Sequence, residues 1–326
     1  MVKFTRREVV ASTLAAPALM LSRNASAASA YPNKNIQFVI PYAPGGGFDV
    51  YVRFIGPVME KYLPNKANIV PINVPAGGGS RGVAQLYRAK PDGYTMGILN
   101  IPGMFILQQQ QGPGAYDLAK FSWIGAMGEG ERYVISVGTN SPLKSFADLK
   151  ALSAKRPVKL SVTGPEGTAY AATQIGSQLL GLKTQLITGY KGSVDYVVAA
   201  IRGDSDAVIA AIPTTMRFVR GGQVRVLATF EAHSGIAGVP DATTLGQPEL
   251  DNISVERLIA APPGVPPEIV NTLSATLAKA LADPAVVAWA KQNDLVMRSH
   301  TPQETVAILN QQRAFFDKWK KYLVTG

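Results

Sequence analysis

The chain has 326 residues with a formal net charge of +10, is 47% hydrophobic and 17% charged, and contains no cysteine. This length exceeds the size at which a single hydrophobic core usually stops growing, so two domains are expected, and the composition excludes disordered and fibrous classes. Without cysteine, the chain can form no disulfide, no thiolate metal site and no thiol nucleophile.

Residues 1–30 are predicted to be a signal peptide. Basic residues, including Arg6 and Arg7, precede an uncharged apolar run at 9–21 that is too short to span a bilayer comfortably. Small-residue triplets follow, so cleavage is expected near Ala27 or Ala30. The paired arginines favour the twin-arginine route, although ordinary charges at the start of a general export signal are the alternative. The mature protein is therefore expected in a periplasm.

Removal of residues 1–30 takes away four basic residues and one acidic residue, so the net charge falls from +10 to +7. This mild excess favours anionic ligands or partners. The basic residues are scattered, without a block or an aromatic-basic stripe, so nucleic acid is not an expected partner.

Strands and glycine loops alternate in the first part of the mature chain. The predicted strands cover 36–41, 69–74 and 95–99, and the first two lead into glycine loops at 44–47 and 76–79. A helical spacing of apolar residues follows each of these loops. The first units are therefore strand, tight loop and helix.

The same rhythm restarts after Pro142. Ser145 is expected to cap a short helix, and further helices are expected at 168–180 and 193–202. The loops before these two helices are 164–167 and 190–192. The strands between them are predicted at 158–163, 184–187, 206–211 and 224–230. Such alternation specifies parallel sheets sandwiched by helices, an α/β fold.

The C-terminal part returns to a strand at 253–261 and then becomes helical from 267 to 282 and again after Asp283. Thr301 and Glu304 form a capping box that opens a final helix, which is expected to run to about residue 322.

Two α/β lobes are predicted from this order. The first combines residues 31–135 with 253–326, and the second covers 136–252. The chain crosses between the lobes twice, as in hinged receptors.

The glycine loops have the chemistry of a carboxylate site. A loop between a strand and a helix directs backbone N–H groups toward the positive end of the helix dipole, and glycine lets a ligand approach them closely. The loops at 44–47 and 76–79 come from successive units, so they should lie side by side and grip one carboxylate. The loops at 164–167 and 190–192 would face them from the second lobe. The alternative is that the glycines merely make tight turns.

The sequence resembles the Bug family, the substrate-binding proteins of tripartite tricarboxylate transporters. The matching motifs occur in the family's order over essentially the whole mature chain. They are Tyr31-Pro32, residues 36–49, Pro75–Ser80, Lys90–Thr95, Tyr190–Ser193, Pro262–Pro266 and Leu281–Pro284.

The resemblance implies a two-lobed Venus-flytrap fold with a ligand cleft between the lobes. It also implies a monomeric, non-enzymatic receptor without cofactor or metal, which delivers a small organic carboxylate to one large and one small membrane subunit. The carboxylate would be held by the first two glycine loops, partly through water. The ligand-binding residues carried over are Tyr42, Ala43, Gly46, Gly47, Phe48 and Asp49 in the first loop; Ala76, Gly77, Gly78, Gly79 and Ser80 in the second; and Gly164, Glu166, Gly167, Thr168, Tyr190, Lys191 and Asp206 in the other lobe. Some family members signal to sensor kinases instead, and the sequence leaves this alternative open.

Two departures from the family pattern bear on the ligand. Phe48 stands where the family usually has Thr or Ser, so an aromatic wall is possible. Glu166 is an acid in a loop of small residues, and it would repel a second carboxylate unless Lys191 or Arg217 neutralises it. These departures favour a monocarboxylate or aromatic acid over citrate, whereas the alternative is that both side chains point to solvent. Asp49 either caps its helix or contacts the ligand.

Enzymatic interpretations account for fewer features of the sequence than a binding receptor does. Gly78–Gly82 matches the nucleophile-elbow pattern of an esterase, with Ser80 as nucleophile, but His233 and His300 are the only candidate bases and no HGGG-type element occurs. Ser80 as a helix cap is the preferred reading. A dinucleotide fingerprint would need a small residue at Val50, and two distant histidines make no metal cluster.

Overall fold

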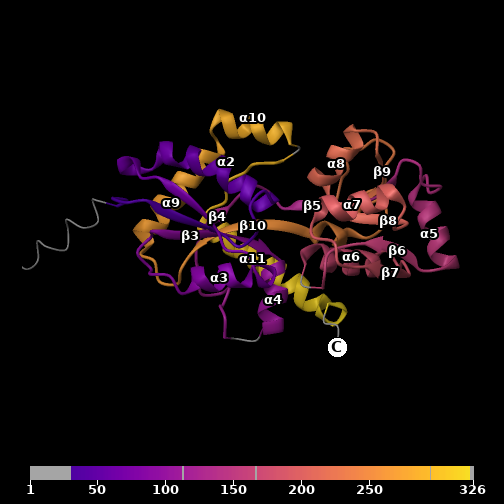
Figure 1. Ribbon diagram of the computed structural model, residues 1–326, viewed down its shortest axis with the longest axis horizontal. Helices are drawn as coiled ribbons and strands as arrows, with labels where there is room; N and C mark the ends of the chain where they lie inside the picture. The colour runs from indigo at the N-terminus through magenta and orange to yellow at the C-terminus, as the bar shows by residue number, and fades with distance from the viewer. Residues whose placement is uncertain (1–30, 112–113, 166, 294, 324–326) are drawn as a thin grey trace, which may run out of the picture.

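The computed structural model describes residues 31–111, 114–165, 167–293 and 295–323, and the predicted signal peptide lies outside these ranges. The chain forms two α/β lobes, which lie side by side along the long axis of the molecule in Figure 1. One continuous path of paired strands runs through both lobes.

The first lobe is built on a mixed five-stranded sheet. Three parallel strands lie in the order β2-β1-β3, and β10 is antiparallel to both β3 and β4. The strands are β1 (Ile36–Ile40), β2 (Ile69–Asn73), β3 (Thr95–Ile101), β4 (Ser122–Ala126) and β10 (Ser254–Ala261).

Helices cover both faces of this sheet, and a separate apolar cluster fills each face. Helices α2 and α9 pack together over one face, and α3 and α4 lie against the other. The helices of this lobe are α2 (Gly47–Tyr62), α3 (Ser80–Tyr87), α4 (Gly103–Gln111), α9 (Pro267–Leu281), α10 (Pro284–Gln292) and α11 (Pro302–Trp319).

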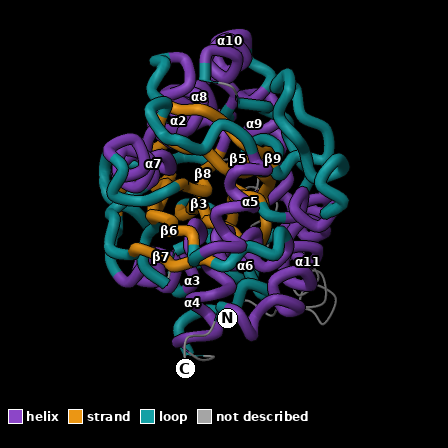
Figure 2. The backbone as a smooth tube through the Cα atoms, turned by 90° about the vertical axis from the view of Figure 1, so that its right-hand side faces the viewer, coloured by secondary structure: helices purple, strands orange, loops and turns teal. Residues whose placement is uncertain are grey.

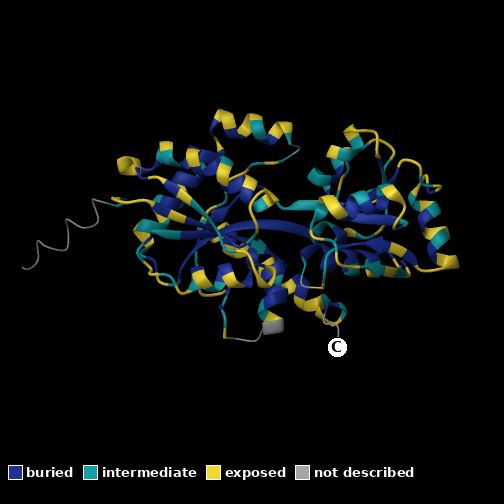
Figure 3. Cartoon of the chain, viewed as in Figure 1, coloured by how far each residue is buried: buried dark blue, intermediate teal, exposed yellow. Residues whose placement is uncertain are grey.

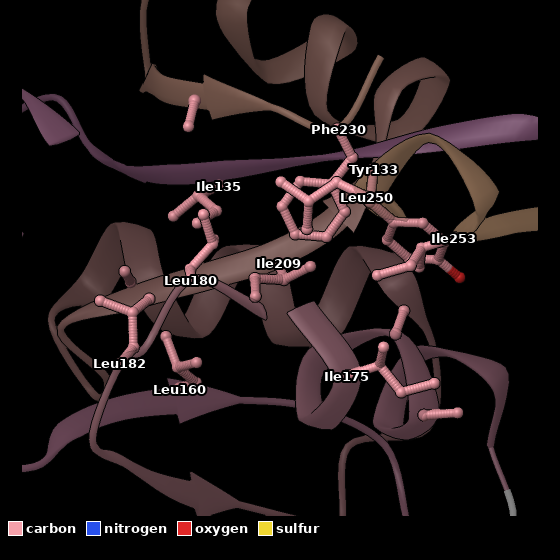
Figure 4. Close-up of a cluster of buried hydrophobic side chains, with 14 of the residues drawn as sticks. Tyr133, Ile135, Leu160, Ile175, Leu180, Leu182, Ile209, Phe230, Leu250 and Ile253 are labelled. Atoms are coloured by element: carbon pink, nitrogen blue, oxygen red, sulfur yellow. The ribbon is translucent and has the colours of Figure 1, made fainter. Parts of the chain in front are cut away.

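The second lobe repeats this layering with a mixed sheet of its own. Strands β7, β6 and β8 are parallel, and β5 is antiparallel to both β8 and β9. Its strands are β5 (Glu131–Gly138), β6 (Val158–Ser161), β7 (Thr184–Ile187), β8 (Ala207–Ala211) and β9 (Val224–Thr229). Its helices are α5 (Phe146–Lys155), α6 (Thr168–Leu179), α7 (Ser193–Arg202) and α8 (Ile212–Arg220). Figure 4 shows part of its larger core, which includes Tyr133, Ile175 and Phe230.

Burial follows the layers. The strands of both lobes are largely buried, whereas the helices expose their outer faces (Figure 3). The view along the long axis shows the strands enclosed by helices (Figure 2). Among the described residues, no helix combines the length and the apolar character needed to cross a bilayer.

The lobes are joined by a narrow strand pairing and by one helix. Strands β5 and β10 share two residue pairs, Ser254 with Arg132 and Val255 with Glu131. Helix α11 passes from lobe to lobe: Leu309 belongs to a core of the first lobe, whereas residues near its end belong to the core of the second. We use the name hinge for residues 127–132 and 251–256.

The local predictions are largely confirmed, with two corrections. All eight predicted strands are present, and both capping boxes form. The sheets are mixed rather than purely parallel, because the strands of the hinge, β5 and β10, run against their neighbours. Four elements were not predicted: strands β4 and β5 and helices α4 and α8. Helix α8 follows β8 directly, so no loop signal marks its start.

Candidate functional site

Three parallel strands of the first lobe end at one edge of its sheet. Ile40, the last residue of β1, lies opposite Asn73, the last residue of β2, so the loops at 41–46 and 74–79 leave the sheet side by side. Strand β3 ends at the same edge with Asn100 and Ile101. The predicted adjacency of the two glycine loops is confirmed.

Asp49 holds the first loop in place. Its side chain is buried, and its carboxylate accepts hydrogen bonds from the Gly45 N–H (2.8 Å), Asn73 Nδ2 (2.8 Å) and Arg53 Nε (2.9 Å). Asn73 Nδ2 also donates to the Tyr42 carbonyl (3.0 Å), which ties the loop to the end of β2.

This network changes the predicted role of Asp49. Desolvation alone would raise the pKa of the carboxyl, but the hydrogen bonds from Arg53, Gly45 and Asn73 together hold the pKa below its ordinary value. The carboxylate is therefore charged and fully engaged within the protein. Its predicted contact with a ligand is corrected: Asp49 positions the loop.

The second loop needs its glycines for the turn itself. Gly77, Gly78 and Gly79 have φ of +57°, +63° and +105°, in the region that side chains disfavour. A Cβ on Gly79 would also lie 3.2 Å from the Pro41 carbonyl oxygen. For this loop, tight turning accounts for the glycines. Ala76, just before them, also has a positive φ, of +143°.

Ser80 is the first residue of α3 and is 8% exposed. The N-cap residue is Gly79, without a side-chain cap bond, so the prediction that Ser80 caps this helix is wrong. His233 and His300, the candidate bases of the esterase reading, line pockets at the hinge instead.

The first loop differs, because turning does not require glycine at Gly46 or Gly47. Gly46 has φ of −75°, and Gly47 is not among the described glycines with positive φ. Among the described residues, a Cβ on Gly46 would meet the Ala43 carbonyl at 3.4 Å, and one on Gly47 would meet Arg257 Nη2 at 4.0 Å. Side chains would fit at both positions. The Gly46 N–H donates to the Ala43 carbonyl over 3.4 Å, and both glycines are exposed at the start of the helix.

Helices that begin at these strand ends lack side-chain caps. The N-cap residues of α2, α3, α6 and α7 are Gly46, Gly79, Gly167 and Gly192, and in the described chain none makes a side-chain cap bond. Helices α5, α10 and α11, which begin elsewhere, are capped by Ser145, Asp283 and Thr301, whereas α9, which follows Pro266, has no side-chain cap. Uncapped first turns carry partial positive charge that suits an anion.

The second lobe touches this edge of the first. Asn100 Nδ2, at the end of β3, donates to Thr168 Oγ1, at the start of α6, over 2.8 Å. Gly103 allows this approach, since a Cβ there would lie 2.7 Å from Thr168 Oγ1. Thr168, a predicted site residue at the start of α6, therefore faces the first lobe.

Several polar atoms at this contact lack a partner among the described residues. They are Tyr42 Oη, Asn100 Oδ1 and Thr163 Oγ1, all inaccessible to solvent. Thr163 Oγ1 adjoins Gly167, where any Cβ would collide with it. Burial raises the pKa of the Tyr42 phenol, and the neighbouring Asn100 side chain and the Arg257 charge offset this only in part, so the phenol keeps its proton. An unsatisfied buried polar group costs about 1–3 kcal/mol, so three at one contact suit a polar ligand.

An aromatic and charged floor lies beneath the first turn of α2. The rings of Phe48 and Tyr42 are 4.7 Å apart, and the Arg257 guanidinium lies 5.0 Å from the Phe48 ring. Arg257 is buried and pairs with Glu131 over 2.7 Å. Burial alone would lower the pKa of Arg257, but Glu131 raises it above its ordinary value.

Phe48 packs against the cores of both lobes, so it does not point to solvent. This removes one of the two alternatives that the sequence left for this side chain.

The other predicted residues of the second lobe are more widely spread. Gly164 lies in the loop beside Thr163, whereas Tyr190 and Lys191 follow β7, the edge strand of the sheet. Tyr190 packs against the second lobe's own core, and Lys191 is exposed. Glu166 lies outside the described residues.

Asp206 is a correction. It precedes β8, at the end of the sheet opposite to the glycine loops, and it pairs with Arg156 through two bonds of 2.7 Å. The Lys159 N–H also donates to it, over 2.8 Å. Hydrogen bonds from Arg156 lower the pKa of Asp206. Its role is to join β6 and β8, not to face a ligand.

The sequence reasoning missed Asn100, Thr163 and Arg257. Asn100 and Thr163 sit at or just beyond strand ends, a position that the strand predictions already marked, and Thr163 also adjoins Gly164. Arg257 carries no local signal, because its contacts come from α2 and β5. Among the described residues, no group of three His, Asp or Glu side chains could hold a metal ion.

Comparison with known proteins agrees with this geometry. Residues 53–322 match the model of the tripartite tricarboxylate transporter family receptor. BugT of Bordetella pertussis is 29% identical over 295 residues, which cover 85% of this chain and 86% of BugT.

Solved structures show the same fold. A periplasmic transporter superposes with a TM-score of 0.77 at 26% identity, covering 89% of this chain and 98% of its own. An R. palustris protein with adipate gives a TM-score of 0.72 at 21% identity, covering 90% and 97%. The family model spans most of the chain, and the resemblance to the Bug family is confirmed. The chain therefore belongs to the tripartite tricarboxylate transporter receptor family, which consists of periplasmic solute-binding proteins.

Proposed function

We propose that this receptor binds a small organic carboxylate between its lobes and delivers it to the membrane subunits of a tripartite tricarboxylate transporter. The carboxylate is held at the first turn of α2, next to Gly46 and Gly47. Tyr42 and Asn100 supply the remaining polar contacts from the first lobe, and Thr163 and neighbouring backbone from the second.

One observation carries this proposal. The start of α2 combines a first turn without a side-chain cap, at exposed glycines that the turn does not require, with unpartnered polar atoms at the contact between lobes. N–H donors and a neutral phenol match carboxylate oxygens, and charge-assisted hydrogen bonds of this kind contribute about 1.5–3 kcal/mol each. Three or four of them support micromolar binding, about −8 kcal/mol.

The ligand class we propose is a monocarboxylate with an apolar or aromatic body. Phe48 and Tyr42 form an aromatic pair beside the glycines, and their rings offer an apolar wall to the body of the ligand. Citrate would bring two more carboxylates against this wall.

Titration calorimetry tests binding and class together. Benzoate and butyrate should bind, their neutral amides should bind at least tenfold more weakly, and citrate should bind more weakly than either acid. Purification under partial unfolding removes ligand carried over from the cells. Equal affinity for acid and amide would refute the carboxylate site, and tight citrate binding would refute the proposed class.

The substitution Tyr42→Phe tests the site itself. It removes a hydroxyl without a described partner, so the free protein should be as stable as before or slightly more stable, while carboxylate affinity falls about tenfold. Tyr62→Phe is the matched control, because the Tyr62 hydroxyl bonds Asp283 (3.0 Å) at the far end of α2. It should leave affinity unchanged. An unchanged affinity in Tyr42→Phe would argue against ligand contact there.

Export and delivery need tests in cells. We propose that residues 1–30 direct the chain to the periplasm by the twin-arginine route, so Arg6→Lys combined with Arg7→Lys should leave the precursor uncleaved in the cytoplasm. Deletion of the gene should abolish uptake of the labelled ligand, and plasmid-borne protein should restore it. Normal uptake without the protein, with a lost transcriptional response to the ligand, would indicate the sensor role instead.

A further inference from the structure

Arg257 lies directly beneath the proposed carboxylate site. Its Nη2 is 4.0 Å from the position of a Cβ on Gly47, and its guanidinium lies 5.0 Å from the Phe48 ring and 4.2 Å from the Tyr51 ring. These residues belong to the first turns of α2, whose N–H groups would receive the carboxylate. A full positive charge is thus placed next to the positive end of a helix.

Glu131 neutralises this charge. Arg257 Nη1 and Nη2 lie 2.7 Å and 3.0 Å from the two carboxylate oxygens, and the Tyr51 hydroxyl donates to Glu131 Oε1 over 2.7 Å. The side chains are 9% and 11% exposed, so solvent screens the pair little. Glu131 opens β5 in the second lobe and Arg257 belongs to β10, so the pair also bridges the hinge.

Resting on the proposed function, we infer that the Arg257–Glu131 pair determines which ligand charge the site accepts. With Glu131 in place, the pair contributes little net potential, and the helix end alone compensates one carboxylate. A second or third carboxylate would lose its water without a matching cation, so di- and trianions are disfavoured. An unpaired Arg257 would instead attract the ligand more strongly with each added negative charge.

Opposite effects of the two single substitutions are the test. Calorimetry is run with benzoate, isophthalate and trimesate, which carry one, two and three carboxylates on one ring, and with butyrate, succinate and tricarballylate. Glu131→Gln should tighten binding of the monoanions about tenfold and of the trianions more. Arg257→Gln should weaken binding about tenfold, because Glu131 is then unpaired near the ligand. The double substitution should return within about threefold of the unmodified protein.

A different result is expected if the Arg257–Glu131 pair only stabilises the fold. Both single substitutions would then weaken binding to a similar extent, with no dependence on ligand charge, and this result would overturn the inference. Tyr51→Phe is the control, since it removes one hydrogen bond to Glu131 but no charge, and it should leave the order of ligands unchanged. Arg257→Lys, which keeps the charge, should also keep that order.

The unmodified protein gives a reading even if the single variants do not fold. Its affinity should not rise from benzoate to trimesate or from butyrate to tricarballylate, and a rise along either series would overturn the inference. If no acid of either series binds, the proposed carboxylate function fails and the inference fails with it. If acids bind but the charge order is reversed, only the inference fails.

Discussion

Gly47 and Gly78 look alike in the sequence, each within a run of three glycines, but the structure gives them opposite requirements. Gly47 is the first residue of α2, with backbone that alanine can adopt. Among the described residues, Arg257 Nη2 is the nearest neighbour that a new Cβ would meet, 4.0 Å away. Gly78 has φ of +63° and ψ of 13°, the left-handed conformation. The same substitution, glycine to alanine, should therefore have opposite effects on stability.

The expected magnitudes follow from these conformations. Gly47→Ala should raise the free energy of unfolding by about 0.4–1 kcal/mol, because alanine restricts the unfolded chain and favours helix. Gly78→Ala should lower it by about 1–2 kcal/mol, because a Cβ is strained in the left-handed region. The methyl at Gly47 also lies beside the N–H groups of the helix start. Loss of one charge-assisted hydrogen bond there should weaken carboxylate binding about 10- to 100-fold.

Urea denaturation of the ligand-free proteins measures the first effect, and calorimetry with benzoate or butyrate measures the second. Gly47→Ala is expected to raise stability and lower affinity. A substitution that disrupts the fold would lower both. If Gly47→Ala were destabilising, or bound carboxylates as well as the unmodified protein, the distinction drawn between the two loops would be wrong.

Three further substitutions test other parts of the structure. Asn100→Ala removes the bond to Thr168 between the lobes and should weaken carboxylate binding about tenfold in calorimetry; an unchanged affinity would contradict it. Desolvation raises the pKa of buried Glu256 above its ordinary 4.5, so its stabilising contribution is present below that pH and is lost as the pH rises through the raised pKa. Glu256→Gln should accordingly raise Tm at pH 7 but not at pH 4, and equal shifts would refute this. Asp206→Asn breaks the pair with Arg156 and should lower stability by about 1 kcal/mol without changing affinity; a change in affinity would return Asp206 to the site.

Local features of the fold could be predicted because their signals are local. The strands before the glycine loops show as short apolar runs, and the helices α5 and α11 show as capping boxes at Ser145 and Thr301. The pairing of β1 with β2 follows from two successive strand-loop-helix units. The sequence thus identified the loops at which we propose the carboxylate binds.

Features made by distant segments escaped prediction. Strands β4 and β5 pair with β10, which follows them by more than a hundred positions, so no local turn marks their pairing. The family resemblance placed Asp206 in the cleft, but Asp206 adjoins the starting end of its strand. Which end of a strand a residue occupies decides whether it faces the cleft, since the ligand loops follow the carboxyl ends.

In this receptor, different residues would attract carboxylates and select among them. In the proposed site, the first turn of α2 would attract any carboxylate, and its glycines were visible in the sequence. Selection among carboxylates requires a floor, and here the floor is assembled from Phe48 on α2, Arg257 on β10 and Glu131, which is 126 positions from Arg257. Because Glu131 opens the strand that enters the second lobe, any movement of the lobes that separates it from Arg257 would expose the cation to the ligand site. The charge that a ligand meets would then depend on the hinge, so affinity and lobe closure should change together when this pair is altered.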